Sequence, residues 1–109
     1  VMPSKELIAA STVPVILSIL ARGESYGYKL IKEVANQSGG QLEWSEAMLY
    51  PVLQRMEKNR LVESRWVEGE NGKKRKYYRI TKAGHEVLED KKSEWLQLHA
   101  FLAHLWKTA

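Results

Sequence analysis

The chain has 109 residues, no cysteine, and 17 basic against 13 acidic side chains, for a net charge of +4. With 44% hydrophobic and 28% charged residues it has the composition of one small globular domain, which excludes disordered and collagen-like chains. Without cysteine it can form no disulfide and no thiolate metal site. Its longest apolar run, residues 13–21, is shorter than the roughly 20 residues of a membrane span and no segment resembles a signal peptide, so we expect a cytosolic protein.

Helical spacing of apolar residues predicts two helices in the first third of the chain. The first covers residues 7–20, where Pro14 implies either a kink or a helix that begins only near Thr12. The second covers residues 26–37, and Ser25 is the expected N-cap of this helix.

A third helix is predicted from Ser45, its N-cap, to Asn59, which closes it. Leucine, valine and methionine side chains recur on one face of this helix at spacings of three and four residues, as expected for a face buried in a core. The opposite face presents Tyr50 and Gln54, and Pro51 should make the first turns irregular.

Two β-forming segments, residues 61–67 and 76–80, flank an Asn-Gly pair and predict a hairpin. A two-residue turn at Asn71 and Gly72 would place Trp66 opposite Tyr77, and would put Tyr78, Ile80 and Val67 on the other face. Both faces are partly apolar, so register alone does not tell which face meets the core. A bulge at Gly69 would change the pairing.

The last predicted helix runs from the N-cap Thr81 to about Lys107. Its length of about 40 Å exceeds what so small a domain can cover, so we expect its second half to pack on another copy of the chain. The alternative is that it packs within one monomer against the first helix. Its apolar seam consists of Leu88, Trp95, Leu98, Leu102 and Leu105, with Trp106 beside it.

The positive charge is concentrated in the second half of the chain. Residues 1–54 carry 4 basic and 5 acidic side chains, whereas residues 55–109 carry 13 and 8. Five basic residues lie within residues 73–79, next to Tyr77 and Tyr78. Such a cluster is typical of a phosphate-binding surface, although it could equally be a solvated hairpin tip that keeps the protein soluble.

The element order predicts a mainly α (α+β) fold, a winged helix-turn-helix with a two-stranded β wing and a long C-terminal dimerisation helix. Residues 1–80 would form the DNA-binding region and residues 81–109 the dimerisation helix of one compact unit. In this fold the third helix enters the major groove while the wing holds phosphates. Alternatively, the helix lysines are merely solvated and Tyr50 folds onto the core beside Trp44. The predicted DNA contacts are Lys29, Lys32, Ser45, Tyr50, Gln54, Lys73, Lys74, Arg75 and Lys76.

Three stretches of the sequence resemble the signatures of the PadR family of bacterial transcriptional regulators. They are Tyr26-Gly27-Tyr28, then Leu49-Tyr50-Pro51-Val52-Leu53 with Met56-Glu57, then Arg75-Lys76-Tyr77-Tyr78-Arg79-Ile80-Thr81 followed by Gly84. The resemblance covers nearly the whole chain in the right order. It implies a winged helix-turn-helix repressor of the short subfamily, in which the last helix packs on its partner and on the first helix, and which controls genes for detoxification or efflux until a ligand arrives.

That resemblance also implies a dimer interface and an effector site. The interface would contain Leu7 and Ile8 of the first helix together with the seam of the last helix. In a multidrug-responsive member of the family, matching tryptophans stack planar aromatic drugs at the dimer centre, which makes Trp95 the ligand-stacking candidate. His99 stands one turn later, where that member has an acid, and Pro14 lies where the pore wall would be. The alternative is that Trp95 only fills the dimer core.

No arrangement of residues predicts an enzyme, a cofactor or a metal site. His99 and His104 point about 140° apart on a helix, and no glycine-rich phosphate loop or nucleophile elbow is present in the sequence. The expected partners are a palindromic double-stranded DNA operator, a second copy of the chain and a planar aromatic effector, with no membrane. The second hypothesis is a winged-helix module that binds another protein through the same surface.

Overall fold

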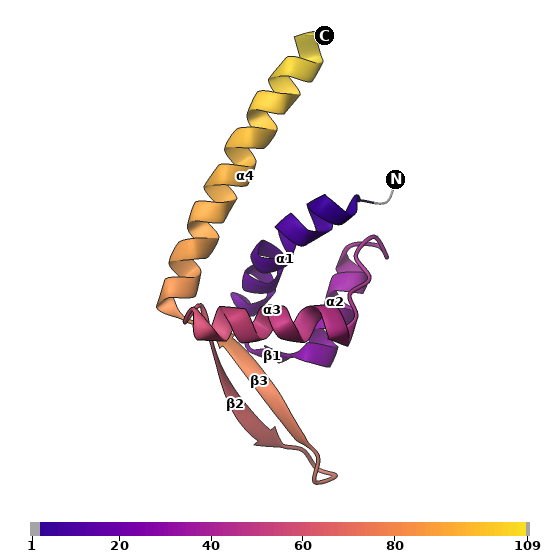
Figure 1. The fold of residues 1–109 in the computed structure, drawn as a ribbon, viewed down its shortest axis with the longest axis vertical. Helices are drawn as coiled ribbons and strands as arrows, with labels where there is room; N and C mark the ends of the chain where they lie inside the picture. The colour runs from indigo at the N-terminus through magenta and orange to yellow at the C-terminus, as the bar shows by residue number, and fades with distance from the viewer. Residues whose placement is uncertain (1–2, 109) are drawn as a thin grey trace.

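The structure is a computed structural model that describes residues 3–108. Three helices form the body of the molecule, a hairpin projects from one side of it, and a long helix leaves the other side (Figure 1). The predicted order of a mainly helical winged helix-turn-helix is confirmed. The elements are α1 (Lys5–Leu20), β1 (Ser25–Tyr26), α2 (Gly27–Gln37), α3 (Glu46–Lys58), β2 (Val62–Glu68), β3 (Lys74–Ile80) and α4 (Lys82–Thr108).

The hydrophobic core lies where α1, α2, α3 and the base of the hairpin meet. Leu17, Leu30 and Leu53, one from each of these helices, are fully buried. The hairpin contributes Val62 and Tyr78, which are also buried. Because α3 turns its leucines and valine toward this core, its polar face is left on the surface.

Helix α1 is continuous through Pro14 and begins at Lys5, so the alternative of a start near Thr12 is wrong. The side chain of Ser4 caps the first turn by accepting a hydrogen bond from the Leu7 amide at 3.2 Å. A proline inside a helix removes one backbone hydrogen bond, and the capped first turns together with the packing of the rest of the helix outweigh that loss.

Strand β1 is an element that the sequence did not predict. It pairs antiparallel with β3, with Ser25 opposite Tyr78 and Tyr26 opposite Tyr77, so the sheet has the order β1-β3-β2. The expectation that Ser25 caps α2 is therefore wrong, because Ser25 is buried in the strand and Tyr26 takes the N-cap position without a side-chain hydrogen bond. Pairing with a strand fifty residues away decided the local structure.

The hairpin has a different register from the predicted one. Trp66 lies opposite Lys76 rather than Tyr77. The hydrogen bond from the Gly69 amide to the Lys73 carbonyl, at 2.7 Å, closes a turn of three residues, 70–72, rather than two. The last of these, Gly72, takes a positive φ of 75°. This register puts Trp66 on the face of Tyr78 and moves Val67 to the other face.

The predicted helix caps at the other boundaries are confirmed. Ser45 accepts a hydrogen bond from the Met48 amide at 3.2 Å, and Asn59 is the C-cap of α3. Thr81 accepts one from the Gly84 amide at 2.9 Å at the start of α4. A Cβ at Gly84 would overlap the carbonyl oxygen of Leu61, so the first turn of α4 packs directly on the chain that leads into β2.

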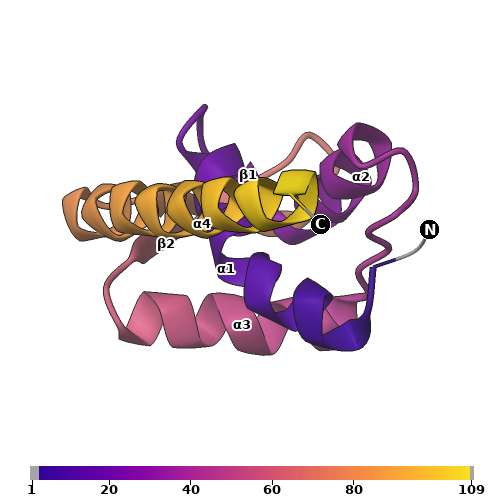
Figure 2. The same cartoon turned by 90° about the horizontal axis from the view of Figure 1, so that it is seen from above.

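Helix α1 lies between α4 and α3, and α4 extends past it into open space (Figures 1 and 2). Only the first turns of α4 join the core, through Leu88, which is buried. Beyond that point most of the seam is open to solvent in the single chain: Leu98 is 51% exposed and Leu105 is 43% exposed, whereas Leu102 is half-buried. Trp106, beside the seam, is 67% exposed. Within residues 3–108 no helix is long and apolar enough to cross a membrane.

Candidate nucleic-acid interface

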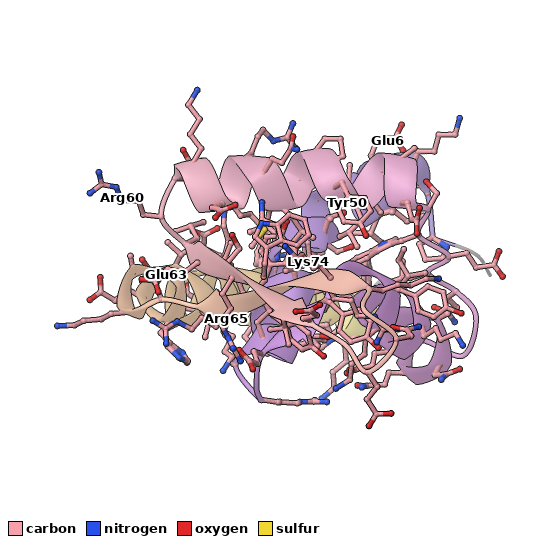
Figure 3. The ribbon with its side chains drawn as sticks, turned by 90° about the horizontal axis from the view of Figure 1, so that it is seen from below. Glu6, Tyr50, Arg60, Glu63, Arg65 and Lys74 are labelled. Carbon is pink, nitrogen blue, oxygen red and sulfur yellow. The ribbon has the colours of Figure 1, made fainter. Side chains whose placement is uncertain are left out.

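A cleft of about 490 Å³ separates the hairpin from the surface face of α3, and we call it the wing cleft. It brings together five of the predicted DNA contacts, two from α3 and three from the hairpin. In Figure 3 the labelled side chains of Tyr50 and Lys74 lie near each other, while Glu63 and Arg65 lie away from them. The lining residues are Tyr26, Gly27, Tyr28, Tyr50, Gln54, Trp66, Lys74, Arg75, Lys76 and Tyr78.

Tyr50 owes its position to a glycine at the start of α2. A Cβ built on Gly27 would lie 2.7 Å from the Tyr50 hydroxyl and 2.9 Å from its ring, so the phenol rests on bare backbone. The ring is still partly exposed. Tyr50 and Gln54 lie four residues apart, one turn of α3, and both open into the cleft.

Arg75 is held at the cleft by Tyr26. Its guanidinium donates a hydrogen bond to the Tyr26 hydroxyl at 2.9 Å and lies 4.5 Å from the centre of that ring. The Tyr26 ring in turn packs against Tyr77 at a centroid distance of 5.1 Å. Strand β1 thus positions an arginine of the wing, since the β1–β3 pairing is what brings these three residues together.

The basic side chains of the hairpin fall into two groups, those that have a carboxylate partner and those that have none. Arg65 forms an ion pair with Glu24, and Arg79 forms one with Glu63 at 2.7 Å. Lys76 lies 3.4 Å from Glu57 of α3 and is partly buried.

By contrast, among residues 3–108 no carboxylate lies within ion-pairing distance of Lys73, Lys74 or Arg75. A cation that already has a carboxylate partner attracts a phosphate less, so the available positive charge lies at the turn and at the cleft end of β3.

The remaining predicted contacts lie outside the cleft. Ser45 caps α3, and Lys73 belongs to the turn at the tip of the hairpin. Lys29 pairs with Glu33 at 3.9 Å along α2. Lys32 lies 4.8 Å from the centre of the Tyr28 ring, so it stands at the rim of the cleft, and the Tyr28 hydroxyl raises the pKa of this lysine.

Four aromatic residues of the cleft are not among the predicted contacts: Tyr26, Tyr28, Trp66 and Tyr78. Two of them, Tyr26 and Tyr28, flank the glycine of the first signature stretch. That Tyr-Gly-Tyr pattern is the signal in the sequence by which these two cleft residues could have been found. The predicted pairing of Trp66 is wrong because it requires a two-residue turn. Burial of the Tyr78 ring raises the pKa of its hydroxyl, as expected for a group that belongs to the core.

A second cavity, of about 530 Å³, opens beside α1, and we call it the α1 groove. It is bounded by α1, by the segment that connects α2 to α3, and by Trp95 of α4, which is 38% exposed. Leu7 and Pro14 line it, whereas His99 does not. Of the two predicted ligand-binding residues, Trp95 therefore lines the groove and His99 does not.

Comparison with known proteins identifies relatives that are similar to this chain in sequence and in fold. The family model described as "Transcriptional regulator PadR-like family" matches residues 16–90, which include every residue that lines the wing cleft. The structure of a transcriptional regulator from Clostridium thermocellum is 31% identical with a TM-score of 0.84, covering 93% of this chain and 95% of that one. A PadR family transcriptional regulator from Eggerthella lenta DSM 2243 is 35% identical with a TM-score of 0.83, covering 95% and 88%.

A relative with a longer chain also matches. The transcriptional regulator YqjI of Escherichia coli strain K12 is 36% identical over 80 residues, which are 73% of this chain and 37% of that protein. The present chain thus spans little more than a third of that relative.

Proposed function

The chain belongs to the PadR-like family of transcriptional regulators, and from that premise we propose that it is a homodimeric repressor whose wing cleft faces double-stranded DNA. One observation carries the proposal. Within residues 3–108, Lys73, Lys74 and Arg75 have no carboxylate partner, and Lys74 and Arg75 line the cleft, whereas Arg65 and Arg79 are paired with carboxylates. Arg75 shares its strand face with Arg65 and Arg79 and reaches the cleft beside Tyr26. This distribution suits a polyanion that approaches from the cleft side.

In this proposal α3 is the recognition helix. Tyr50 and Gln54 contact base edges in the major groove, where a glutamine can bond an adenine through two hydrogen bonds. In this orientation Ser45, at the start of α3, contacts the sugar-phosphate backbone of the DNA. The phosphate contacts are Lys73, Lys74 and Arg75 on the wing, with Lys29 and Lys32 on α2. Lys76 and Lys29 contribute less, because Glu57 and Glu33 already pair with them.

We assign the dimer interface to residues 81–109 and to the part of α1 that carries Leu7 and Ile8. Residues 1–80 then act as the DNA-binding region of each subunit. The apolar seam of α4 supports this assignment, because a chain of this size does not leave so many large apolar side chains in water without a partner. Two recognition helices about 34 Å apart would read a palindromic operator.

Salt titration of DNA binding tests the proposal. Replacing Lys74 and Arg75 together by alanine should reduce the slope of log affinity against log salt by about 0.9 for each phosphate that is no longer neutralised. The matched control removes two hairpin charges that already have carboxylate partners, with Arg65 and Arg79 replaced by alanine, and should change the slope much less. Equal slopes for the two double variants would contradict the orientation. The probe is a duplex obtained by selecting bound fragments from the protein's own genome.

Release by an effector is the second part of the proposal. A planar aromatic or hydrophobic molecule stacks on Trp95 at the dimer interface and reaches the α1 groove that Trp95 lines. The groove contains Arg22, which donates to the Gln37 amide oxygen at 3.1 Å, and its lining includes no acidic side chain. Neutral or anionic compounds are therefore preferred over cations. The role of His99 stays a prediction, since this side chain lies outside the groove.

Tryptophan fluorescence tests the effector. Planar aromatic compounds of each charge type are titrated against the protein and against Trp95→Phe, which keeps an aromatic ring in the interface. Quenching that is present in the parent and absent in the variant is expected, and the same compound should weaken DNA binding. Identical quenching in both proteins would leave Trp95 as a packing residue.

A further inference from the structure

Trp66 is a large apolar side chain that the fold leaves in solvent. It is 66% exposed, although it stands on the same face of the hairpin as two core residues, Val62 and Tyr78. Along β2 this face passes from the buried Val62 through the half-buried Ser64 to Trp66, as the strand leaves the body. The tryptophan therefore points to the cleft side of the wing just beyond the last residue that the core can cover.

The indole of Trp66 has a positive charge on one side, from its cross-strand neighbour. Lys76 lies opposite it, with the ammonium 6.0 Å from the Trp66 ring and 5.6 Å from the Tyr78 ring. That ammonium is itself fixed by Glu57 at 3.4 Å. Trp66 thus presents a large apolar surface beside a positive charge, which suits a partner that carries both apolar groups and negative charge.

The surroundings of Trp66 indicate the kind of partner that covers it. The same cleft holds Lys74 and Arg75, for which the described part of the chain supplies no carboxylate partner, and the α3 residues Tyr50 and Gln54 face it. A protein partner would have to be strongly acidic to suit this surface, whereas a duplex brings its own phosphates next to apolar sugar and base edges.

We propose that Trp66 is a DNA-contacting residue of the wing, whose indole packs on the sugars and base edges of the duplex bound in the wing cleft. The inference rests on the proposed function, because it requires the cleft to face DNA. The ring supplies apolar contact that lysine and arginine do not, and its Nε1–H supplies one hydrogen-bond donor. Because it carries no charge, its contribution is independent of salt.

Measuring affinity at several salt concentrations separates this contact from the phosphate contacts. With a selected duplex as the probe, Trp66→Ala should weaken binding about tenfold, equivalent to about 1.4 kcal/mol, without changing the salt slope. Trp66→Phe, which keeps a ring, should recover part of that loss. Val67→Ala is the matched control, because Val67 is the next residue of β2 and does not line the wing cleft. It should bind like the parent, and its unchanged salt slope checks that the cross-strand neighbour Arg75 is undisturbed.

Fluorescence supplies a readout that a purely structural role would not move. Adding the duplex should quench part of the tryptophan emission of the parent, and this part should be missing in Trp66→Phe. Thermal unfolding of the three variants checks that the hairpin remains folded.

The outcomes separate the inference from the proposed function. If Trp66→Ala binds DNA like the parent while Lys74→Ala with Arg75→Ala still lowers the slope, the inference is wrong and the function stands. If Trp66→Ala changes the salt slope, the ring acts through Lys76 and the direct contact is wrong. If the parent protein binds neither the selected duplex nor a random-sequence duplex, the proposed function fails and this inference fails with it.

Discussion

The wing and the second half of α4 both project from the same small body, but their surfaces are of opposite character (Figure 1). The wing carries lysine and arginine around a few aromatic rings, whereas α4 ends in leucine, phenylalanine and tryptophan. A charged projection is stable in water and attracts a polyanion, while an apolar one is stable only when another apolar surface covers it. The difference agrees with the proposal that the two ends serve different partners, nucleic acid at the wing and a second copy at α4.

The largest expected effect comes from placing a charge in the α4 seam. Leu98→Asp should convert the dimer to a monomer, because an unpaired carboxylate in an apolar interface is costly. Without the second half-site, operator binding should weaken on the order of 100-fold. Light scattering after gel filtration and a DNA titration measure the two effects.

The control for that variant lies two residues earlier on the same helix. Leu96 is 68% exposed and points about 200° away from Leu98 around the helix axis. Leu96→Asp should leave the dimer and the DNA affinity unchanged. A dimer that survives Leu98→Asp, or that is abolished equally in both variants, would break the comparison between the two ends.

A smaller effect is expected where the wing cleft depends on bare backbone. Gly27→Ala places a methyl group against the ring of Tyr50 and should displace that ring. DNA binding should weaken about fivefold, which corresponds to about 1 kcal/mol, the free energy of one hydrogen bond. Stability should not fall, since alanine favours a helix more than glycine. In a double-mutant cycle, Gly27→Ala should cost nothing further once Tyr50→Ala is present. Additive losses would mean that Gly27 acts independently of Tyr50.

The shape of the wing can be disturbed without altering its charge. Gly72 has a φ of 75°, so Gly72→Ala should destabilise the hairpin by about 1 kcal/mol, because a Cβ is strained in that region. Gly72→Asn should cost less, since asparagine tolerates this conformation. Thermal unfolding and DNA titration of both variants check the order. Equal stability of the alanine and asparagine variants would argue against the three-residue turn.

The smallest effect is expected on the outer side of the wing. Arg65 holds the pKa of Glu24 below its ordinary value of 4.5 through a side-chain hydrogen bond. Because the folded-state pKa is lowered, the pair stabilises the fold fully at pH values above the ordinary pKa of 4.5. This stabilisation is lost as the pH falls through the folded-state pKa. Glu24→Gln should therefore be slightly less stable than the parent at neutral pH and equal to it in acid, in unfolding curves recorded across that range. Its DNA salt slope should match the parent, and a steeper slope would mean that freed Arg65 reaches the duplex.

Local patterns in the sequence determined most of the fold. The helix positions follow from apolar spacing, and Ser45, Asn59 and Thr81 mark boundaries because their side chains or positions satisfy backbone groups nearby in the chain. The positive cluster at residues 73–76 and the tyrosine and glutamine of α3 are also visible from sequence, because charge and helical face are local properties. The family signatures lie on the elements that build the wing cleft.

What only the tertiary structure decided are the features that depend on residues far apart in the chain. The pairing of Tyr26 with Tyr77 created β1 and holds Arg75 at the cleft. The hairpin register, set by the hydrogen bond between Gly69 and Lys73, turned Trp66 to the cleft side. Which lysines and arginines face carboxylates likewise depends on spatial neighbours. A count of charges along the chain could therefore locate the basic surface, but not the cations within it that lack a carboxylate partner.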